Sequence, residues 1–333
     1  MSGSGSAVGR TAEKGRTTVT ETAALRPAAE AAVPGGSPLP RRLTVAVVSY
    51  ECRELLRDCL ASLEDQAAAV GAHVVVVDNA STDGTPEMVR EAFPWVTLIA
   101  NPDNQGFGRA SNAALRLVDS GHVLLLNPDT VLPADGLARA LRALEERPSV
   151  GILGVRLVQR DGTVDHASRR QIPTPASSLA YLLKLRRPGS RTAYTDPAAF
   201  DTEGVVGAVN GAFMLMRDET FRAVGGFDED FWMYGEDLDL CLRVTRAGWD
   251  VYYWPGLDVL HVKGGSSGRL RTFRVNRAFH HAMWLFYRKH QRRTYGPAVT
   301  VLVAVGIAGK FALSVARSLL LRGMRRRPSS PKA

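Results

Sequence analysis

Short, continuous runs of apolar residues alternate with longer amphipathic segments through the first 130 residues. Residues 43–49 and 73–78 are runs of this kind, typical of strands that are buried on both faces. Between them, apolar side chains recur at helical spacing over 53–66. The alternation continues with a helix over 86–93, a strand over 96–100, a helix over 107–118 and a strand over 123–127. This order predicts an α/β fold with a mainly parallel sheet covered by helices on both faces.

The second half of the chain has a less regular pattern. Apolar runs predict strands over 151–158, 205–216 and 250–254, and Asn210-Gly211 interrupts the second of them. Residues 160–203 contain four prolines among several arginines and lysines. We expect a long loop region there, because structureless segments of that length are usually functional or disordered.

Charge is distributed unevenly along the 333 residues, which carry 42 lysines and arginines against 33 acids. Every acid lies at or before Asp258, whereas residues 263–333 hold 16 basic residues. The net charge of +9 therefore belongs to a mildly acidic body with a cationic tail. This arrangement indicates an anionic surface that is contacted by one end of the chain.

The cysteines and the first forty residues bear on the cellular compartment. The three cysteines include no C-x-x-C pair, so the sequence favours neither a disulfide framework nor a thiolate zinc site. Residues 1–40 are rich in small and polar residues without a continuous apolar stretch. We therefore expect a reducing, intracellular compartment and a disordered leader rather than a secretory signal.

Polar side chains follow the predicted strands at the edge where a parallel sheet binds ligands. They are Ser49-Tyr50, Asp78-Asn79 and Asn127-Pro128-Asp129. Asp78 could accept the imide N–H of a uracil or thymine ring, and Ser81 supplies an oxygen in the turn that follows. Asp129 could bind Mg²⁺ or Mn²⁺ together with a nucleotide diphosphate. Both segments are also favourable turn sequences in any protein, and that interpretation stays open.

A third cluster combines aromatic and acidic residues. Trp232 and Tyr234 precede three acids within residues 236–239, at the start of a predicted helix. The helix dipole favours acids in a first turn, which is one explanation of Glu236 and Asp237. Three acids exceed what capping requires, and crowded like charges can raise the pKa of one carboxyl toward that of a general base.

His261 lies 24 residues after Asp237, beyond the strand-like run 250–254. A histidine taken alone is more often structural than a ligand. His261 becomes a candidate site residue because it occurs together with the other motifs.

Taken in order, the segments resemble the family 2 glycosyltransferases and, within them, the bacterial rhamnosyltransferase branch. The resemblance covers residues 43–267. It rests on Val47-Val-Ser-Tyr50, Asp78-Asn-Ala-Ser-Thr-Asp83, Asn104-Gln-Gly-Phe-Gly108 with Asn112, Leu126-Asn-Pro-Asp129, Gly225-Gly-Phe-Asp228, Met233-Tyr-Gly-Glu-Asp237 and His261. It implies a GT-A-type nucleotide-diphospho-sugar transferase fold.

Roles follow from the resemblance by position. It implies a catalytic base at Asp237 with Glu236 beside it, and a divalent cation, Mg²⁺ or Mn²⁺, held by Asp129 and His261. Asn127 replaces the first Asp of the family's Asp-x-Asp motif, which removes one anionic ligand and puts metal dependence in question. The implied donor contacts are Ser49, Tyr50, Asp78, Asn79, Ser81, Asn104, Gly106, Arg109, Asn112 and Asn127. The implied acceptor contacts are Gly211, Trp232, Tyr234 and Arg243. The family commonly has Asn where this chain has Glu51.

Residues 106–111 nearly match a dinucleotide-binding fingerprint. The last position is Ser, no strand comes directly before the match, and no acidic ribose-binding residue follows at the expected place. A Rossmann oxidoreductase is therefore rejected. Arg109, inside this segment, is either a contact to phosphate or sugar or a solvated helix residue.

Residues 298–321 form an apolar stretch that only Lys310 and Arg317 interrupt with charge. The uncharged run 298–309 is too short to span a bilayer, so the pattern favours an interfacial helix over a spanning one. Basic residues on both sides would face anionic headgroups. A helix packed on the catalytic domain and a nucleic-acid-binding tail are alternatives. The tail's aromatic residues favour packing or membrane anchoring, so we expect no nucleic-acid partner.

We therefore expect a leader (1–40), a catalytic domain (41–267) with donor half 41–135 and acceptor half 136–267, and a basic helical tail (268–333). The resemblance implies inverting transfer of L-rhamnose from dTDP-L-rhamnose to a polyprenyl-diphosphate-linked saccharide of a bacterial envelope. The enzyme would be attached peripherally to the cytoplasmic face of the membrane. One alternative is a UDP-hexose donor with another acceptor, and another is a catalytically silent nucleotide-sugar-binding scaffold.

Overall fold

The computed structural model describes residues 42–118, 121–182, 200–262 and 272–325. The predicted leader lies outside these ranges, as does the Gly-Gly-Ser-Ser segment that follows His261.

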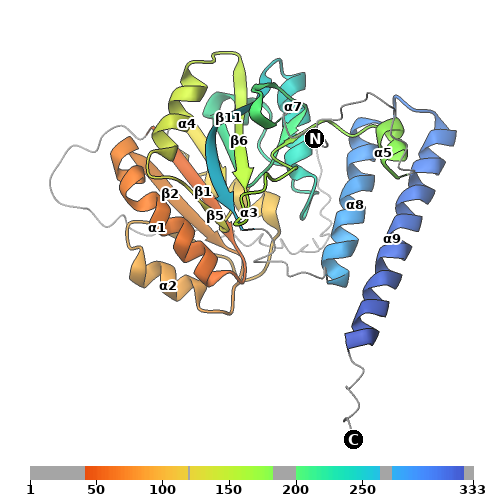
Figure 1. The fold of residues 1–333 in the computed structure, drawn as a ribbon, viewed down its shortest axis with the longest axis horizontal. Helices are drawn as coiled ribbons and strands as arrows, with labels where there is room; N and C mark the ends of the chain where they lie inside the picture. The colour runs from red at the N-terminus through yellow and green to blue at the C-terminus, as the bar shows by residue number, and fades with distance from the viewer. Residues whose placement is uncertain (1–41, 119–120, 183–199, 263–271, 326–333) are drawn as a thin grey trace, which may run out of the picture. The chain divides into compact units, whose positions relative to one another are not determined.

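One large sheet runs through the described residues in the order β3-β2-β1-β4-β10-β6-β11-β5, with β8 paired to β11 outside this path (Figure 1). The strands β1, β2, β3 and β4 are mutually parallel, and β6 is parallel to β11. The strand β10 is antiparallel to both of its neighbours and joins the two parallel groups. The bounds are β1 (Leu43–Ser49), β2 (Ala72–Asp78), β3 (Thr97–Ala100), β4 (His122–Leu126), β5 (Thr130–Val131), β6 (Val150–Val158), β8 (Gly204–Val205), β10 (Phe213–Arg217) and β11 (Asp250–His261).

Helices cover both faces of this sheet, because alternate residues of each strand point to opposite sides. In β1, Val45 and Val47 belong to one core cluster with Leu60 of α1, whereas Ala46 packs in a second cluster with Ala110 of α3. The first cluster is covered by α1 (Arg53–Val70), α2 (Thr85–Ala92) and α4 (Gly136–Glu145). The second is covered by α3 (Phe107–Leu115), α6 (Asp218–Ala223) and α7 (Glu236–Arg246). The predicted α/β architecture is confirmed.

The expectation of a long loop over 160–203 is wrong for part of that segment. It contains β7 (Arg169–Arg170), which pairs with β9 (Ala208–Val209), and the helix α5 (Pro175–Leu182). The two residues of β7 are both arginines, so their strand conformation comes from pairing with a distant segment and leaves no local apolar pattern. Residues 183–199 of the predicted loop lie outside the described residues.

The run predicted over 205–216 forms three short strands, β8, β9 and β10. The predicted interruption at Asn210-Gly211 is confirmed, whereas the break at Gly207 was not predicted. Gly207 separates the first two, and a Cβ there would lie 2.6 Å from the backbone nitrogen of Ile172. A turn at Asn210 separates the next two, where the Asn210 side chain accepts a 2.9 Å hydrogen bond from the Ala212 N–H. The strand predicted over 250–254 continues to His261 through a register shift between Trp254 and Asp258.

The predicted C-terminal helical tail is present as α8 (Phe273–His290) and α9 (Pro297–Arg325). Phe231 packs with Ala282, Leu285 and Phe286 of α8, which joins this helix to the catalytic domain. Residues 297–320 of α9 are long and apolar enough to cross a membrane, judged by length and composition alone, and none of that span is buried.

Candidate active site

Three strand ends lie in register at one edge of the sheet. Ser49 at the end of β1 pairs with Asp78 at the end of β2, and Asp78 pairs with Ala100 of β3. The Asn79 N–H donates to the Ser49 carbonyl at 2.8 Å, which fixes the loops after β1 and β2 together. The Ser49 hydroxyl is buried 3.3 Å from the Cys52 sulfur, so this side chain supports the loop from inside.

The Asp78 carboxylate is buried at the start of the loop after β2. It accepts hydrogen bonds from the Ser81 N–H at 2.8 Å and from the Ser81 hydroxyl at 2.6 Å. Burial raises the pKa of Asp78 above its ordinary value, and the two bonds from Ser81 offset part of that rise. Ser81 therefore orients a carboxylate whose remaining lone pairs could accept an N–H from a ligand.

Glu51, to which the sequence assigned no role, joins the same two loops. Its backbone is left-handed, with φ of 49°, and its carboxylate accepts hydrogen bonds from the Thr82 N–H at 2.9 Å and hydroxyl at 3.0 Å. Its own N–H donates to the Ser81 hydroxyl at 2.9 Å. The Glu51 carboxylate thus holds the loop after β2 in place. Its neighbour Tyr50 is 42% exposed at this edge.

The predicted donor contacts Asn79 and Asn104 shape the loop around Gly106. The Asn79 amide donates to the Gly106 carbonyl at 3.1 Å, and Asn104 accepts from the Gly106 N–H at 3.0 Å. Gly106 has a φ of 86°, and a Cβ there would lie 2.3 Å from the Trp232 carbonyl oxygen. The loop before α3 is therefore pressed against the segment that precedes the acidic cluster.

Three other predicted ligand contacts, Asn112, Arg109 and Arg243, form hydrogen bonds or ion pairs with other residues of the protein. The Asn112 amide exchanges two 2.9 Å hydrogen bonds with the backbone of Phe227. Arg109 pairs with Glu229 at 3.1 Å. Arg243 pairs with the fully buried Asp239 at 2.7 Å and also donates to the Val224 carbonyl. These contacts hold the Gly225-Gly-Phe-Asp228 segment between α3 and α7.

Asp129 and His261 lie together although 132 residues separate them in the sequence. The register of β5 against β11 places His261 opposite Thr130, and the His261 Nε2 lies 3.4 Å from an Asp129 carboxylate oxygen. The other ring nitrogen faces the buried Asp165 at 3.2 Å. Burial alone would lower the pKa of His261, but the adjacent carboxylates of Asp129 and Asp165 outweigh it and raise the pKa to about 9.

Asp129 and His261 offer a divalent cation two ligands. The buried Oδ1 of Asp129 faces the His261 ring at 3.4 Å but accepts no hydrogen bond of good geometry from any described residue. No group of three or more acidic, histidine or cysteine side chains within the described ranges could hold a metal ion. Mg²⁺ is nevertheless commonly bound by one or two carboxylates with substrate phosphates and water, and a carboxylate commonly orients a metal-binding imidazole. Asp129 and His261, with Asp165 behind the ring, fit a cation that arrives with a diphosphate.

Asp237 and Glu236 occupy different environments in the first turn of α7. Asp237 forms an ion pair with Arg170 of β7 at 2.5 Å, and Arg170 also donates to the Val209 carbonyl at 2.6 Å. Glu236 is buried, and burial, followed by the charge of Asp237, raises its pKa to about 8. A buried carboxyl with its pKa raised in this way can hold its proton near neutral pH.

The turn after β9 connects the acidic residue of α7 with the end of β4. The Gly211 N–H donates to Asp237 at 3.3 Å, and the carbonyl of the next residue, Ala212, accepts from the Asn127 N–H at 3.1 Å. The segment from Asn127 to Asp129 and the Asp237 carboxylate therefore meet on the same turn. No hydrogen bond or ion pair joins Asp237 to His261 in the described part of the chain.

The predicted acceptor contacts Trp232 and Tyr234 are half-buried against α8. The guanidinium of Arg274 lies 4.5 Å from the Trp232 ring centroid, and the Tyr234 ring meets Phe279 edge to face at 5.5 Å. Tyr234 has a φ of 71°, an uncommon conformation for an aromatic residue.

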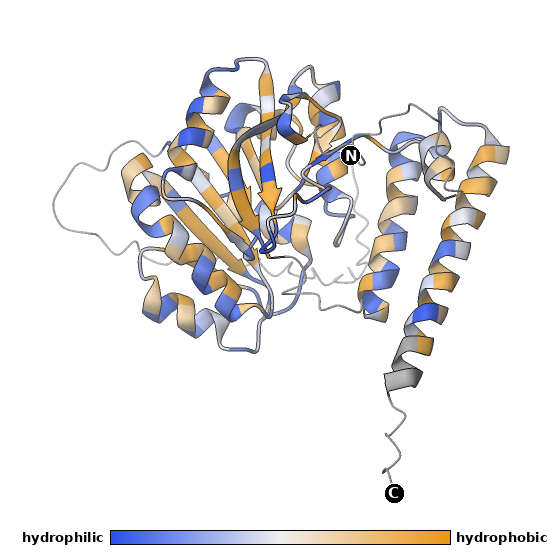
Figure 2. Ribbon diagram, viewed as in Figure 1, coloured by the Kyte–Doolittle hydropathy of each residue, from blue (hydrophilic) through white to orange (hydrophobic). Residues whose placement is uncertain are grey.

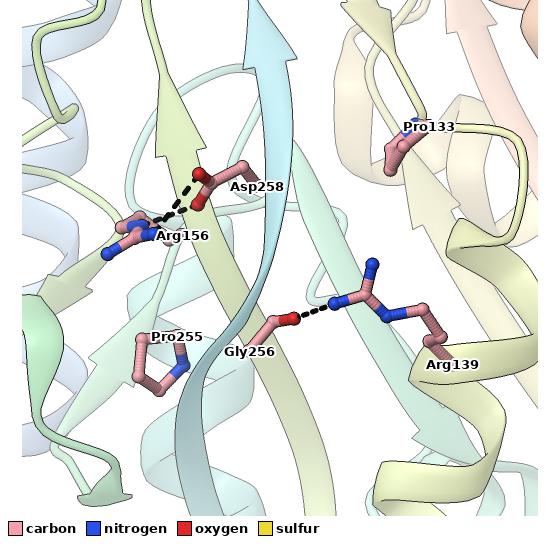
Figure 3. A pocket seen from close by; sticks show the side chains of 6 residues that line it. All are labelled: Pro133, Arg139, Arg156, Pro255, Gly256 and Asp258. Carbon is pink, nitrogen blue, oxygen red and sulfur yellow. Dashed lines mark hydrogen bonds and ion pairs between the residues drawn. The ribbon is translucent and has the colours of Figure 1, made fainter.

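A surface pocket lies elsewhere, between α4 and the irregular part of β11 (Figure 3). Arg156 faces Asp258 there, and Arg139 donates to the Gly256 carbonyl. None of the predicted site residues lines it. Because its arginines are already paired within the protein, it carries no feature of a diphosphate site.

Comparison with known proteins identifies the class. Residues 40–296 match the family described as Glycosyltransferase like family 2, and the chain belongs to this family. An N-acetylglucosaminyl-diphospho-decaprenol L-rhamnosyltransferase of Mycobacterium tuberculosis is 34% identical over 242 residues, 68% of this chain and 78% of that protein. The rhamnosyltransferase WbbL of Escherichia coli K12 is 29% identical over 166 residues, 47% of this chain and 60% of that protein. The protein is therefore a glycosyltransferase with rhamnosyltransferase relatives.

Solved structures support the fold. The mannosyltransferase PcManGT from Pyrobaculum calidifontis, in complex with GDP-Man and Mn²⁺, has a TM-score of 0.53 and 21% identity, covering 89% of this chain and 79% of that one. The Staphylococcus aureus protein TarS has a TM-score of 0.51 and 15% identity, covering 80% of this chain and 43% of that one. The predicted GT-A fold is confirmed.

Proposed function

We propose that this glycosyltransferase moves L-rhamnose from dTDP-L-rhamnose to a hydroxyl of a polyprenyl-diphosphate-linked saccharide in bacterial envelope synthesis. The observation that carries the proposal is the 34% identity to a rhamnosyltransferase whose name gives a diphospho-decaprenol acceptor. The orientation of Asp78 by Ser81 supports a pyrimidine nucleotide, because its free lone pairs could accept the imide N–H of thymine.

The proposed reaction is a direct displacement at the anomeric carbon. Asp237 accepts the proton of the acceptor hydroxyl as the oxygen forms its bond to that carbon. The bond from the carbon to the diphosphate breaks from the opposite face, so configuration inverts and dTDP leaves. Arg170 holds the Asp237 carboxylate in position, and Glu236 next to it is buried with a raised pKa.

Asp129 and His261 would hold a divalent cation, which supplies positive charge to the departing diphosphate when it is bound. Asp165 orients the His261 ring for this role. Asn127, in place of an acid, contributes no charge to the site.

The acceptor class and the basic tail support attachment at the cytoplasmic face of the membrane, where nucleotide sugars and lipid-diphosphate acceptors would meet. Residues 263–333 hold 16 basic residues and no acid, as expected for a segment that contacts anionic lipid.

The test is incubation of the purified full chain with a panel of nucleotide sugars and a lipid-diphosphate-linked N-acetylglucosamine, with and without chelator, followed by product mass. Transfer of a deoxyhexose from the dTDP donor, with the opposite anomeric configuration, is expected. Transfer only from a UDP-hexose would replace the proposed donor. Absence of both transfer and donor hydrolysis across the panel would indicate a binding scaffold.

A further inference from the structure

The helix α9 lacks the polarity of a helix on the surface of a soluble protein, because most of its polar side chains are half-buried beside apolar ones such as Val303 and Phe311, while large apolar side chains are exposed. Between Pro297 and Leu320, this helix has five polar side chains, Thr300, Lys310, Ser314, Arg317 and Ser318. All except Arg317 are half-buried, on the stripe that faces α8. An ordinary surface helix buries its apolar stripe and exposes its polar one.

The inward stripe is tied to α8 by specific polar contacts. The Thr300 hydroxyl lies 2.9 Å from the Tyr287 hydroxyl, and Ser314 donates to the buried Asn276 at 3.0 Å. The Lys310 ammonium lies 5.7 Å from the Phe279 ring centroid. These contacts fix which side of α9 points outward.

Apolar residues dominate α9 between Pro297 and Leu320 (Figure 2). Arg317 is the one charged residue among the exposed positions of this range. The large exposed apolar side chains of α9 are between 57% and 74% exposed, and they are Val301, Leu302, Val305, Leu313, Leu319 and Leu320. An apolar face of this length on a soluble surface usually marks a contact with lipid or protein.

The packing of α8 argues against a spanning position for α9. The helix α8 lies along α9 and carries Arg274, Arg277, Arg288 and Lys289 (Figure 1). It is joined in turn to the catalytic domain through Phe231. If α9 crossed a bilayer while keeping its contacts with α8, these charges and the part of the catalytic domain around Phe231 would be drawn toward hydrocarbon, where charged side chains are costly.

We propose that α9 lies flat in the membrane interface, with the face of Leu302, Val305 and Leu313 in the acyl boundary and α8 above it. The occupant is lipid rather than a second copy, because basic residues bracket the helix and the chain has no acid after Asp258 with which another copy's tail could pair. Anionic headgroups supply that missing charge.

This position deepens the proposed function and, in that part, rests on it. Gly235 approaches Ala282 of α8, with a virtual Cβ 3.5 Å from the Ala282 side chain, and Asp237 follows two residues later. One helix layer, about 8–10 Å between axes, thus separates the lipid-bound helix from the segment leading to the base. The short distance from the membrane surface to Asp237 favours an acceptor sugar that is attached directly to the lipid diphosphate over one at the end of a long glycan.

The membrane arm of the test uses the purified full chain and sedimentation with phosphatidylcholine vesicles, with and without phosphatidylglycerol. The double variant Leu302→Glu, Leu313→Glu should reduce the vesicle partition coefficient at least about tenfold, because two carboxylates would replace leucines that contact the acyl chains in the proposed position. The matched control is Leu117→Glu, Val205→Glu, which places the same charges on exposed apolar residues of the catalytic domain, 43% and 62% exposed. Its partition should equal that of the wild type.

Unchanged vesicle binding by the α9 variant would overturn the proposal. So would a dimer of the wild type, seen by analytical ultracentrifugation, that the α9 variant dissociates without a loss of vesicle binding. Thermal unfolding verifies that both variants fold.

The activity arm compares a vesicle-borne acceptor with a detergent-dispersed one. The α9 variant should lose transfer at least about tenfold only with the vesicle-borne acceptor. Equal transfer to short and long lipid-linked glycans in vesicles would overturn the inference that the accepting sugar lies close to the membrane surface. Failure of transfer with every acceptor would overturn the proposed function, while the sedimentation result would still decide the membrane surface.

Discussion

The guanidinium of Arg170 lies 2.5 Å from the Asp237 carboxylate and links two segments that are 67 residues apart. Both side chains are largely buried, at 17% and 13% exposure. Arg170 is itself fixed by its bond to the Val209 carbonyl and by the pairing of β7 with β9. The small two-stranded sheet therefore supports the residue proposed as the base.

Replacing Arg170 should lower kcat because the Asp237 carboxylate would lose its positioning contact. We expect Arg170→Met to lower kcat about 10²-fold, the effect of a misplacement near 1 Å, with little change in the KM for the donor. Arg170→Lys should recover part of the loss, since it keeps the charge but not the planar fork. Steady-state kinetics measure both, with the exposed Arg160→Met as control. A Met variant with the wild-type kcat would contradict the positioning role.

Replacing Asp237 with Asn removes the proton acceptor while keeping the shape of the side chain. We expect kcat to fall by about 10²–10⁴-fold, the usual contribution of general base catalysis. Donor binding, measured by calorimetry, should change little. The control is Glu219→Gln, an exposed acid of α6. Near-normal transfer by the Asn variant would assign the base elsewhere.

The raised pKa of Glu236 predicts a pH dependence of stability. Burial, followed by the charge of Asp237, raises this pKa from 4.5 to about 8, so the folded state holds the proton more tightly than the unfolded state. Stability from this group is complete below the unfolded pKa and is lost as pH rises toward the folded one. The melting temperature of the wild type should therefore fall relative to that of Glu236→Gln between about pH 5 and about pH 8. Parallel melting curves for the two proteins across this range would contradict the burial of an ionisable Glu236.

The pattern of apolar residues predicted the sheet because buried parallel strands need continuous apolar runs, as in Val74 to Val77 of β2. It also placed Asp78 and Asp129 at strand ends, because the order of strands and helices determines which loops share an edge. The positions of Arg170 and Asp165 left no such signal. Both depend on pairing across distant segments, which the local sequence does not encode.

The orientation of α9 could not be predicted from the sequence either. Lys310 and Arg317 are seven residues apart, a spacing that predicts one shared helical face. In the structure Lys310 is half-buried toward α8, whereas Arg317 is exposed. The helical spacing predicts that the two side chains point in similar directions from the helix axis. Which side of α9 faces α8 depends on tertiary contacts such as that of Lys310 with Phe279.

Restoring an acid at position 127 should strengthen cation binding at the proposed Asp129 and His261 site. Asn127→Asp adds one anionic ligand, and cation affinity in oxygen-ligand sites rises with ligand charge. We expect the Mn²⁺ concentration for half-maximal activity to fall at least about tenfold. Calorimetric titration of Mn²⁺ in the presence of dTDP gives a readout that does not depend on turnover.

The control for position 127 is Gln159→Glu, which adds a charge to the loop after β6. Asp129→Asn should have the opposite effect and raise the Mn²⁺ requirement. If Asn127→Asp left both the activity profile and the titration unchanged, Asn127 would not be part of a cation site.

Adding a methyl group at Gly106 tests whether the loop before α3 is set by its contact with Trp232. A Cβ at Gly106 would lie 2.3 Å from the Trp232 carbonyl, and its φ of 86° is unfavourable for alanine. We expect Gly106→Ala to lower the free energy of unfolding by about 1–3 kcal/mol, the usual cost of a strained backbone position. Donor affinity should fall as well, since Asn79 and Asn104 both bond to this glycine.

The matched control for Gly106→Ala is Gly121→Ala, where nothing lies within 4 Å of the added Cβ. Denaturant unfolding of the three proteins compares their stability, and calorimetry with dTDP compares donor affinity. Because Gly106 lies against Trp232 and the Trp232 segment leads to Asp237, a displaced loop would also lower kcat. Equal stability of the two alanine variants would mean that the loop can move away from Trp232 at no cost, and the contact would then not determine the geometry of the site.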